Sequence, residues 1–109
     1  MGDGTDPLVR ANRVYDGRTG GIFVTHGASP RVEGNEVWGN ASEGIFIAGS
    51  GTFPVVIGNI VRDGLDDGIY VVDAAAPTIE NNRILDNALL AIRVADDAEP
   101  FVGANVIRT

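Results

Sequence analysis

The sequence contains no cysteine and no lysine, and each absence narrows the chemistry that the chain can support. Without cysteine there is no disulfide framework and no thiolate that could bind a metal or carry redox chemistry. The eight basic residues are all arginine, fifteen residues are acidic, and the net charge is -7. Nucleic-acid binding depends on basic residues that neutralise phosphates, so this balance argues against DNA or RNA as a partner.

Long hydrophobic runs and targeting signals are also missing. No stretch approaches the roughly eighteen apolar residues of a membrane span, and the segment MGDGTDPLVR lacks the basic and apolar regions of a signal peptide. We therefore expect no membrane partner, and these absences favour the cytoplasm without deciding the compartment. With 44% hydrophobic residues spread over 109 positions, the composition is that of one folded domain.

Proline is scarce, and its positions reveal an internal repeat. The five prolines are separated by 23, 24, 23 and 23 residues: Pro7, Pro30, Pro54, Pro77 and Pro100. An asparagine follows each proline by five residues: Asn12, Asn35, Asn59, Asn82 and Asn105. We therefore expect an N-terminal extension over residues 1–6 and a single repeat domain over residues 7–109, with coils that start at 7, 30, 54, 77 and 100. The one extra residue falls in AGSGTF, which has the composition of a loop.

Within each repeat, β-branched apolar residues recur at a spacing of two, which is typical of strands, and no segment carries a helical stripe. Each repeat therefore contains three short strands. Stacked repeats place each strand beside its equivalent, in parallel and about 4.8 Å away. The sequence predicts an all-β, right-handed parallel β-helix, a solenoid with three strands and about 23 residues per coil and between four and five coils.

The recurring polar and small residues each have an expected duty in this solenoid. We expect the asparagines to adopt a left-handed backbone at the turn between the first two strands, and their side chains to stack as a hydrogen-bonded ladder. Gly21, Gly44 and Gly68 open the third strand, where a side chain would crowd the turn, and Ala91 takes this place in the fourth coil.

The segments DPLVRANRVYDGRTGGIFV and GNEVWGNASEGIFI resemble the repeats of the right-handed parallel β-helix family, whose pectate-lyase-like members act on or bind carbohydrates. The motif is most similar to the β-helix substrate-binding repeats of the F-box-only protein family and related bacterial proteins. Coils with Asp16-Gly17 and Asp63-Gly64 alternate with coils that have Asn40-Ala41 and Asn87-Ala88, as in that group. The resemblance implies the fold, but such repeats serve enzymes and binding scaffolds alike.

Outward positions of the third strand offer a candidate binding surface, formed by Phe23, Phe46, Tyr70 and Arg93. Rings stacked about 4.8 Å apart, with Thr25, Ala48, Val72 and Ala95 next along, predict an apolar outer sheet. This surface fits a protein partner or self-association. Ring stacking that stabilises the sheet itself, cover from a neighbouring segment, and a platform for stacking sugars are the alternatives.

Catalysis is suggested only by resemblance. Asp66-Asp67-Gly68-Ile69 looks like the paired aspartates of polygalacturonases, and Glu43 lies one coil below Asp67. Neighbouring carboxylates can share a site for acid–base chemistry. The other segments of that family's active site are missing, however, and the lone His26 lies on the opposite turn. We therefore expect no catalytic residues, with Glu43, Asp66 and Asp67 as the weak candidates.

Lyases of the same fold bind calcium, which takes six to eight oxygen ligands. The sequence stacks Asp63 under Asp86 and Asp73 under Asp96, and these aspartates are the weak calcium candidates. Solvated turn carboxylates explain them equally well, and we expect neither a metal nor another cofactor.

Two further sets of outward residues look like devices that fix the register of the coils. Arg10 stacks under Glu33 and Arg13 under Glu36, as opposite charges one coil apart, and Tyr15 with Trp38 forms a second aromatic stack. Such exposed ion pairs stabilise by only about a few tenths of a kcal/mol, but they disfavour a slipped register.

Taken together, the sequence favours a non-catalytic β-helix repeat domain that acts as a protein-interaction or self-assembling scaffold. Its contacts would use the open coil ends or the outer aromatic sheet, and we expect the chain to be a fragment of a longer protein. The alternative is a carbohydrate-binding or polysaccharide-degrading β-helix module, with a neutral carbohydrate as its ligand.

Overall fold

The computed structural model describes residues 7–108, so the predicted N-terminal extension over residues 1–6 lies outside the described residues, as does Thr109. Within residues 7–108 every regular element is a strand, and no helix there could cross a membrane. The first two coils contain β1 (Leu8–Arg10), β2 (Arg13–Tyr15), β3 (Ile22–Val24), β4 (Arg31–Glu33), β5 (Glu36–Trp38) and β6 (Ile45–Ala48). The next two contain β7 (Val55–Ile57), β8 (Ile60–Arg62), β9 (Ile69–Val72), β10 (Thr78–Glu80), β11 (Arg83–Leu85) and β12 (Ile92–Val94). Two strands follow in a fifth coil, β13 (Phe101–Val102) and β14 (Val106–Arg108).

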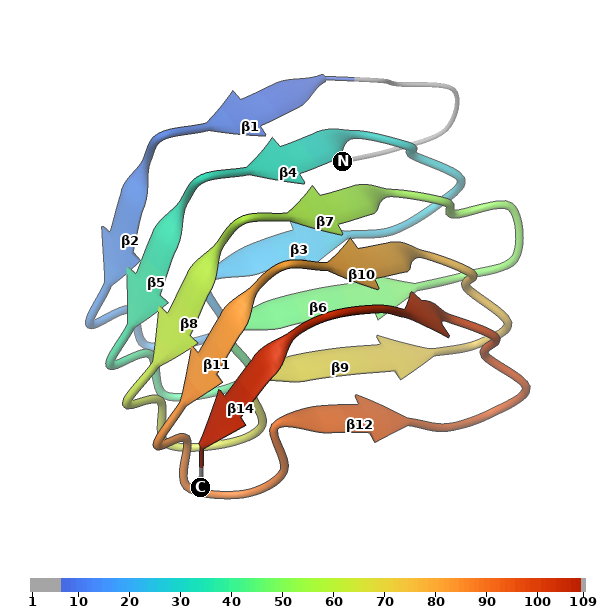
Figure 1. Cartoon of the computed structure of the whole chain (residues 1–109). Coiled ribbons are helices and arrows are strands. Elements are labelled where there is room, and N and C mark those ends of the chain that lie inside the picture. The colour runs from blue at the N-terminus through green and yellow to red at the C-terminus, as the bar shows by residue number, and fades with distance from the viewer. Residues whose placement is uncertain (1–6, 109) are drawn as a thin grey trace.

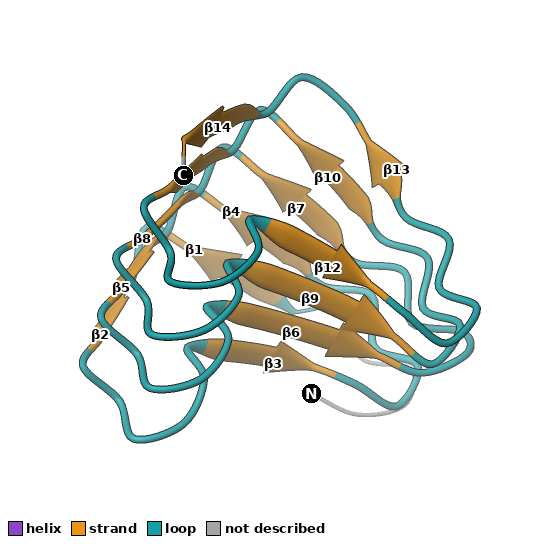
Figure 2. Cartoon of the chain, turned by 90° about the horizontal axis from the view of Figure 1, so that it is seen from below, coloured by secondary structure: helices purple, strands orange, loops and turns teal. Residues whose placement is uncertain are grey.

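The strands form three parallel sheets around one core (Figures 1 and 2). Sheet A contains the first strand of every coil, in the order β1-β4-β7-β10-β13. Sheet B contains the second strands, β14-β11-β8-β5-β2, and sheet C the third strands, β12-β9-β6-β3. Four three-stranded coils and two strands of a fifth within residues 7–108 confirm the predicted parallel β-solenoid.

Strand pairing follows the predicted repeat throughout sheet A. Val9 pairs with Val32, and Val32 with Val56, so equivalent positions of successive coils lie side by side. The extra residue between Pro30 and Pro54 is accommodated in the loop before Pro54. There the buried Thr52 hydroxyl accepts a hydrogen bond from the Gly27 N–H at 2.9 Å and donates one to the Ala48 carbonyl at 3.0 Å. The insertion therefore leaves the register of the sheets intact.

The core consists of the inward aliphatic residues of all three sheets. In the middle coils these side chains have no solvent exposure, as for Val56 in sheet A, Ile84 in sheet B and Ile69 in sheet C. Each such side chain stabilises the fold by roughly 1.5–3 kcal/mol on burial. Because the alternating residues face outward, the core-facing side chains of the strands are apolar, and the buried polar residues lie in the turns and loops.

The predicted asparagine ladder is present along the corner between sheets A and B. Asn59 shows the arrangement, since its Oδ1 accepts from the backbone N–H and the Nδ2 of Asn35, at 2.9 and 3.0 Å. Its Nδ2 donates to the Val32 carbonyl and to Oδ1 of Asn82, both at 2.9 Å. Each interior rung thus bonds to the coils on both sides, and no buried side-chain nitrogen or oxygen within residues 7–108 lacks a partner.

The expected left-handed backbone at the asparagines is wrong. In the first four coils the left-handed residue is the one before the ladder asparagine, with φ of 55° at Ala11, 64° at Gly34, 67° at Gly58 and 53° at Asn81. This preceding residue makes the turn and is exposed, whereas the ladder asparagine keeps an ordinary φ and points into the wall. The two duties are therefore divided between neighbouring residues.

The glycines that open the third strand have the duty predicted for them. A Cβ on Gly68 would lie 2.6 Å from the Ala91 carbonyl oxygen and 2.7 Å from a methyl group of Ile84, closer than atoms pack. Gly44 meets the same obstacle, 2.7 Å from the Gly68 carbonyl oxygen. The obstacle comes each time from the coil above, and no coil of the described chain lies above this turn at Ala91, where a methyl group fits.

Removal of one interior rung should destabilise the fold strongly. In Asn82→Ala, the Asn59 N–H and Nδ2 lose their acceptor and the Val56 carbonyl loses its donor, all in the interior. At about 1–3 kcal/mol for each unsatisfied buried group, we expect a loss of about 3–5 kcal/mol in the free energy of unfolding. Urea denaturation followed by circular dichroism measures this loss.

The matched control is Asn81→Gly, which changes the exposed neighbour at φ 53° to the residue found in two other coils. This variant should be as stable as the parent or slightly more stable. Equal losses in both variants would show that the ladder bonds contribute nothing beyond the turn.

Candidate functional site

The outer face of sheet C carries the predicted column of Phe23, Phe46, Tyr70 and Arg93, hereafter the outer column. Strand register places the four side chains one above another. The Phe23 and Phe46 ring centroids lie 5.3 Å apart with planes tilted by 50°, and Phe46 meets Tyr70 edge to face at 5.6 Å. The Arg93 guanidinium lies over the Tyr70 ring at 5.7 Å. The rings therefore touch one another and also face solvent, Phe23 being 46% exposed.

The apolar surface around the outer column is narrower than expected. The positions next along the strands were predicted to face outward, but Ala48 and Val72 are buried, at 8% and 6% exposure. Beyond them the chain turns toward sheet A at Asp73 and Asp96, both of which are exposed with a left-handed backbone. On the outward face of this sheet, the exposed apolar surface thus consists mainly of the rings of Phe23, Phe46 and Tyr70.

The three carboxylates considered for catalysis lie at the opening of β6 and β9, where each has a bonding partner nearby. Asp67 is 2% exposed, and its Oδ1 accepts from the Leu90 N–H at 2.9 Å while its Oδ2 accepts from Arg93 Nε at 2.7 Å. Asp66 accepts a hydrogen bond from the Asp67 N–H at 2.7 Å, and Glu43 accepts one from the Ser42 hydroxyl. The carboxylate with the best burial for acid–base work is therefore committed to an ion pair.

Arg93 connects this acidic turn to the outer column. Arg93 belongs to the coil after that of Asp67, and its side chain spans the distance between the two coils and binds Asp67. The Asp67 hydrogen bond is the main reason that the pKa of the Arg93 guanidinium is raised, so the arginine stays charged beside Tyr70. This pair anchors one end of the outer column.

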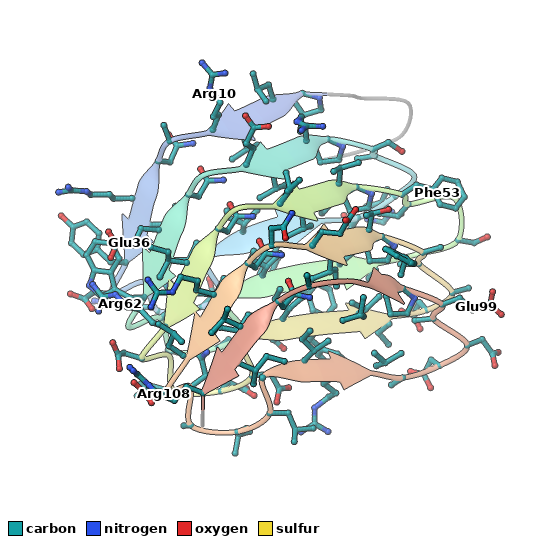
Figure 3. All side chains as sticks on the ribbon, viewed as in Figure 1. Arg10, Glu36, Phe53, Arg62, Glu99 and Arg108 are labelled. Carbon is teal, nitrogen blue, oxygen red and sulfur yellow. The ribbon has the colours of Figure 1, made fainter. Side chains whose placement is uncertain are left out.

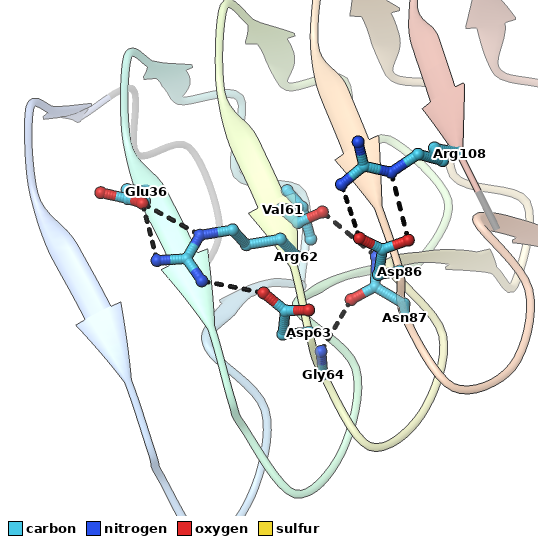
Figure 4. Close-up of polar contacts among 8 residues, drawn as sticks. All are labelled: Glu36, Val61, Arg62, Asp63, Gly64, Asp86, Asn87 and Arg108. Carbon is cyan, nitrogen blue, oxygen red and sulfur yellow. Dashed lines mark hydrogen bonds and ion pairs between the residues drawn. The ribbon is translucent and has the colours of Figure 1, made fainter.

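Two of the four aspartates considered for calcium form ion pairs with arginines (Figure 4). Asp86 binds Arg108 through both oxygens, at 3.2 and 2.6 Å, and Asp63 accepts from Arg62 at 2.8 Å. Within residues 7–108, no three histidine, aspartate or glutamate side chains gather where they could hold a metal ion. The other candidate pair, Asp73 and Asp96, lies exposed at the turn after sheet C.

The second aromatic stack on sheet B is tighter than the outer column and includes an unpredicted arginine. Tyr15 and Trp38 lie parallel, 4.5 Å apart with planes 8° from coplanar, and Arg62 covers the other face of Trp38 at 4.8 Å. Arg62 also binds Glu36 at 3.0 Å, so the predicted partner of Arg13 is taken by an arginine of the next coil (Figures 3 and 4). Of the two predicted ion pairs, the Arg10–Glu33 pair is the one that forms, at 4.0 Å. Both faces of Trp38 are covered, which leaves no open face of that ring for a ligand.

The lone His26 borders an open hollow of about 320 Å³. Its other lining residues are Thr25, Ala48, Gly49, Ser50 and Asp73. The hollow lies over Gly49 of the second coil, between His26 of the first coil and Asp73 of the third. It is at the far end of sheet C from Asp67, as expected for the opposite turn, and it brings no catalytic group near the carboxylates.

A second set of asparagine bonds explains the alternation of Asp-Gly and Asn-Ala coils. Asn40 Oδ1 accepts from the Gly17 N–H at 2.9 Å, and Asn87 Oδ1 accepts from the Gly64 N–H at 3.0 Å (Figure 4). A Cβ at Gly17 would lie 2.9 Å from Asn40 Oδ1, so glycine in one coil accommodates asparagine in the next. The alternation therefore joins each Asp-Gly coil to the following Asn-Ala coil by a hydrogen bond.

Comparison with known proteins agrees with this architecture. A family model described as a right-handed β-helix region matches residues 1–107, nearly the whole chain. The chain belongs to the right-handed β-helix family. Comparison with curated proteins and with solved structures gave no match. The β-helix family match gives the handedness of the solenoid, and it does not extend to the F-box-only group or to any one activity.

The Asp67–Arg93 pair predicts the consequence of removing its exposed member. In Arg93→Ala, a carboxylate with 2% exposure keeps only the Leu90 N–H as a donor. Breaking a buried pair from one side leaves an uncompensated charge, so the urea midpoint should fall. The second change in Asp67→Asn/Arg93→Ala removes that charge and should restore part of the loss.

Arg83→Ala is the matched control, because Arg83 is exposed in the same coil and forms no ion pair within residues 7–108. It should shift the urea midpoint little. A double variant no more stable than Arg93→Ala would contradict the role given to the buried charge.

The Asp86–Arg108 pair predicts a direction of pH dependence. The Arg108 hydrogen bond lowers the pKa of the Asp86 carboxyl below its ordinary value. A carboxyl with a lowered pKa in the folded state stabilises the fold above its ordinary pKa, and that stabilisation disappears as the pH falls through the lowered value. In Arg108→Ala the NMR titration midpoint of Asp86 should rise, whereas Arg10→Ala, in the first coil, should leave it in place. An unmoved midpoint in Arg108→Ala would show that the pair does not form in solution.

Proposed function

We propose that this β-helix is a non-catalytic interaction scaffold whose outer column binds a protein segment carrying apolar and basic side chains. The observation that carries the proposal is the outer column itself, a row of aromatic side chains on an exposed and rigid sheet. Aromatic residues are enriched among those that dominate binding energy at protein interfaces. The ladder and the closed core hold them in fixed positions, which lowers the entropic cost of binding.

The charges beside the outer column indicate what kind of segment fits. Acidic residues border it at both ends of the strands, with Glu43 and Asp66 before the strands and Asp73, Asp96 and Asp97 after them. Together with the net charge of -7, this favours a partner with arginine or lysine on either side of its apolar residues. An acidic partner would be repelled.

Ring orientation favours a protein partner over a sugar. Planes tilted by 50° and 80° with respect to their neighbours do not form one flat platform for the face of a pyranose ring. In the flatter stack, Tyr15 and Arg62 cover the two faces of Trp38, so that a single ring face, that of Tyr15, is open. The carboxylates near the outer column are bonded to neighbouring groups, which supports a role in structure and charge over glycoside hydrolysis.

The test uses an extended nonapeptide of alternating leucine and arginine, titrated by calorimetry and by amide NMR. The peptide should bind with shifts centred on β3, β6 and β9, and its affinity should fall with salt. Phe46→Ser/Tyr70→Ser should weaken binding about 30-fold, the loss of about 2 kcal/mol expected for an interface hot spot.

Tyr15→Ser is the matched control, since it removes an exposed aromatic residue from sheet B and should leave peptide binding unchanged. A peptide with glutamate in place of arginine should not bind. Saturable binding of neutral oligosaccharides that is lost in Phe46→Ser/Tyr70→Ser, with no peptide binding, would replace the scaffold by a carbohydrate-binding module.

A further inference from the structure

Exposed core positions concentrate at one end of the solenoid. Val94, Val102 and Ile107 occupy inward positions of the last coils, yet they are 47%, 45% and 49% exposed. Their equivalents one coil below, such as Val71 and Ile84, have no exposure. We call this end, formed by β12, β13 and β14, the C-terminal face. The opposite end is the N-terminal face, formed by β1, β2 and β3.

The asparagine ladder is directional, and its two ends are complementary. In every interior step, the N–H and Nδ2 of one asparagine donate to Oδ1 of the asparagine in the following coil. At the C-terminal face, Asn105 has no following rung within residues 7–108, and both its N–H and its Nδ2 donate to the Gly103 carbonyl, at 2.9 and 3.2 Å. At the N-terminal face, Asn12 Oδ1 accepts no hydrogen bond from any other described residue. The donors that would continue the ladder at the C-terminal face are thus held by a carbonyl of the same turn, and Asn12 Oδ1 of a second copy would replace that carbonyl as their acceptor.

Side chains on either side of the ladder match in the same sense. If the N-terminal face of one copy lay on the C-terminal face of another, the repeat register would set five pairs of positions side by side. These are Phe101 with Leu8, Val102 with Val9, Asn105 with Asn12, Ile107 with Val14, and Arg108 with Tyr15. The first four are apolar or ladder contacts of the kind found inside the chain.

The fifth pair repeats a contact that the chain already makes twice. Arg62 covers Trp38 from the coil above, and Arg93 covers Tyr70 in the same sense. Arg108 follows in the same column as Trp38 and Arg62 and has a 63% exposed side chain, while Tyr15 begins that column and is 56% exposed. Placed over the free face of Tyr15, Arg108 would gain a cation–π contact.

We propose that the chain assembles head to tail, with the C-terminal face of one copy on the N-terminal face of the next. Strands β13 and β14 pair in parallel with β1 and β2 of the second copy, so sheets A and B and the asparagine ladder continue across the joint. Sheet C does not continue, because residues 7–108 contain no third strand in the fifth coil, and β12 and the second copy's β3 lie one strand position apart. The two faces differ, so the contact is heterologous and forms open chains of copies rather than a closed dimer.

The first measurement is solution mass by light scattering over a range of concentrations. The parent chain should grow beyond a dimer as concentration rises. Ile107→Arg on the C-terminal face and Val14→Arg on the N-terminal face change positions that face each other across the joint. The association constant of each variant should be at least tenfold lower than that of the parent, so each alone should stay monomeric where the parent assembles. An equimolar mixture of the two variants retains one intact face of each kind and should give a heterodimer that grows no further.

Exposed substitutions keep the test valid if Val14→Arg lowers stability. Leu8→Asp and Phe101→Asp change outward residues, 57% and 62% exposed, that face one another across the same joint. They should reproduce the pattern, with circular dichroism to verify the fold. Leu65→Arg, at an exposed loop position away from both ends, should assemble like the parent.

Each alternative gives a different result, and each overturns head-to-tail assembly. A parent chain that stays monomeric removes it altogether. Dimers that persist in the N-terminal face variants and vanish in the C-terminal face variants show two C-terminal faces paired with each other. Assembly lost only in Phe46→Ser/Tyr70→Ser assigns self-association to the outer column. Because the head-to-tail joint does not use the outer column, failure of the assembly and failure of peptide binding are separate outcomes.

Discussion

The stacking of equivalent residues directly over one another, one coil apart, is the constraint on which the structure depends. A buried amide such as Asn59 needs two acceptors and two donors, and the apolar interior supplies none. Its partners are the equivalent asparagines and the valine carbonyl of the adjoining coils. An asparagine in one coil therefore requires an asparagine in the next, and the same holds for the glycines whose Cβ would meet the coil above. This mutual dependence explains why the repeat is strict inside the wall and loose outside it.

The architecture could be predicted because the period is visible in residues whose duty depends only on their column. Five prolines at nearly equal spacing fix where each coil starts, and two-residue spacing of aliphatics fixes which side chains face the core. Backbone conformation within a column is less visible. The left-handed turn falls on Ala11, Gly34, Gly58 and Asn81, which are three different residue types. The sequence therefore carries no common signal for the turn, and the left-handed φ was expected at the regularly spaced asparagine beside it. Spacing identifies a column, but the φ angle of each member depends on the local path of the chain.

The candidate site was only partly predictable, since long side chains do not stay in their own coil. The outer column followed from strand register alone, because each aromatic ring contacts the ring at the equivalent position of the neighbouring strand. Arginines reach farther. Arg62 leaves its coil to bind Glu36, which replaces the pair expected between Arg13 and Glu36, and Arg93 reaches down to Asp67, a pair that was not expected. Burial of Asp67 was equally invisible, because it depends on an N–H and an arginine supplied by the following coil.

The long arginine side chains add a chemical polarity to the direction that the parallel strands already give the solenoid. Both outward columns begin with aromatic rings in the first coil and continue to arginine in later ones, Tyr15 to Arg62 on sheet B and Phe23 to Arg93 on sheet C. In each column the guanidinium covers the ring below it. On sheet B, a copy added in the same direction places the next ring over a guanidinium, whereas a copy added in the opposite direction places arginine near arginine and ladder donors near donors. Since like charges and unmatched donors both cost free energy, the same side-chain order that stabilises one chain favours a single polarity between chains.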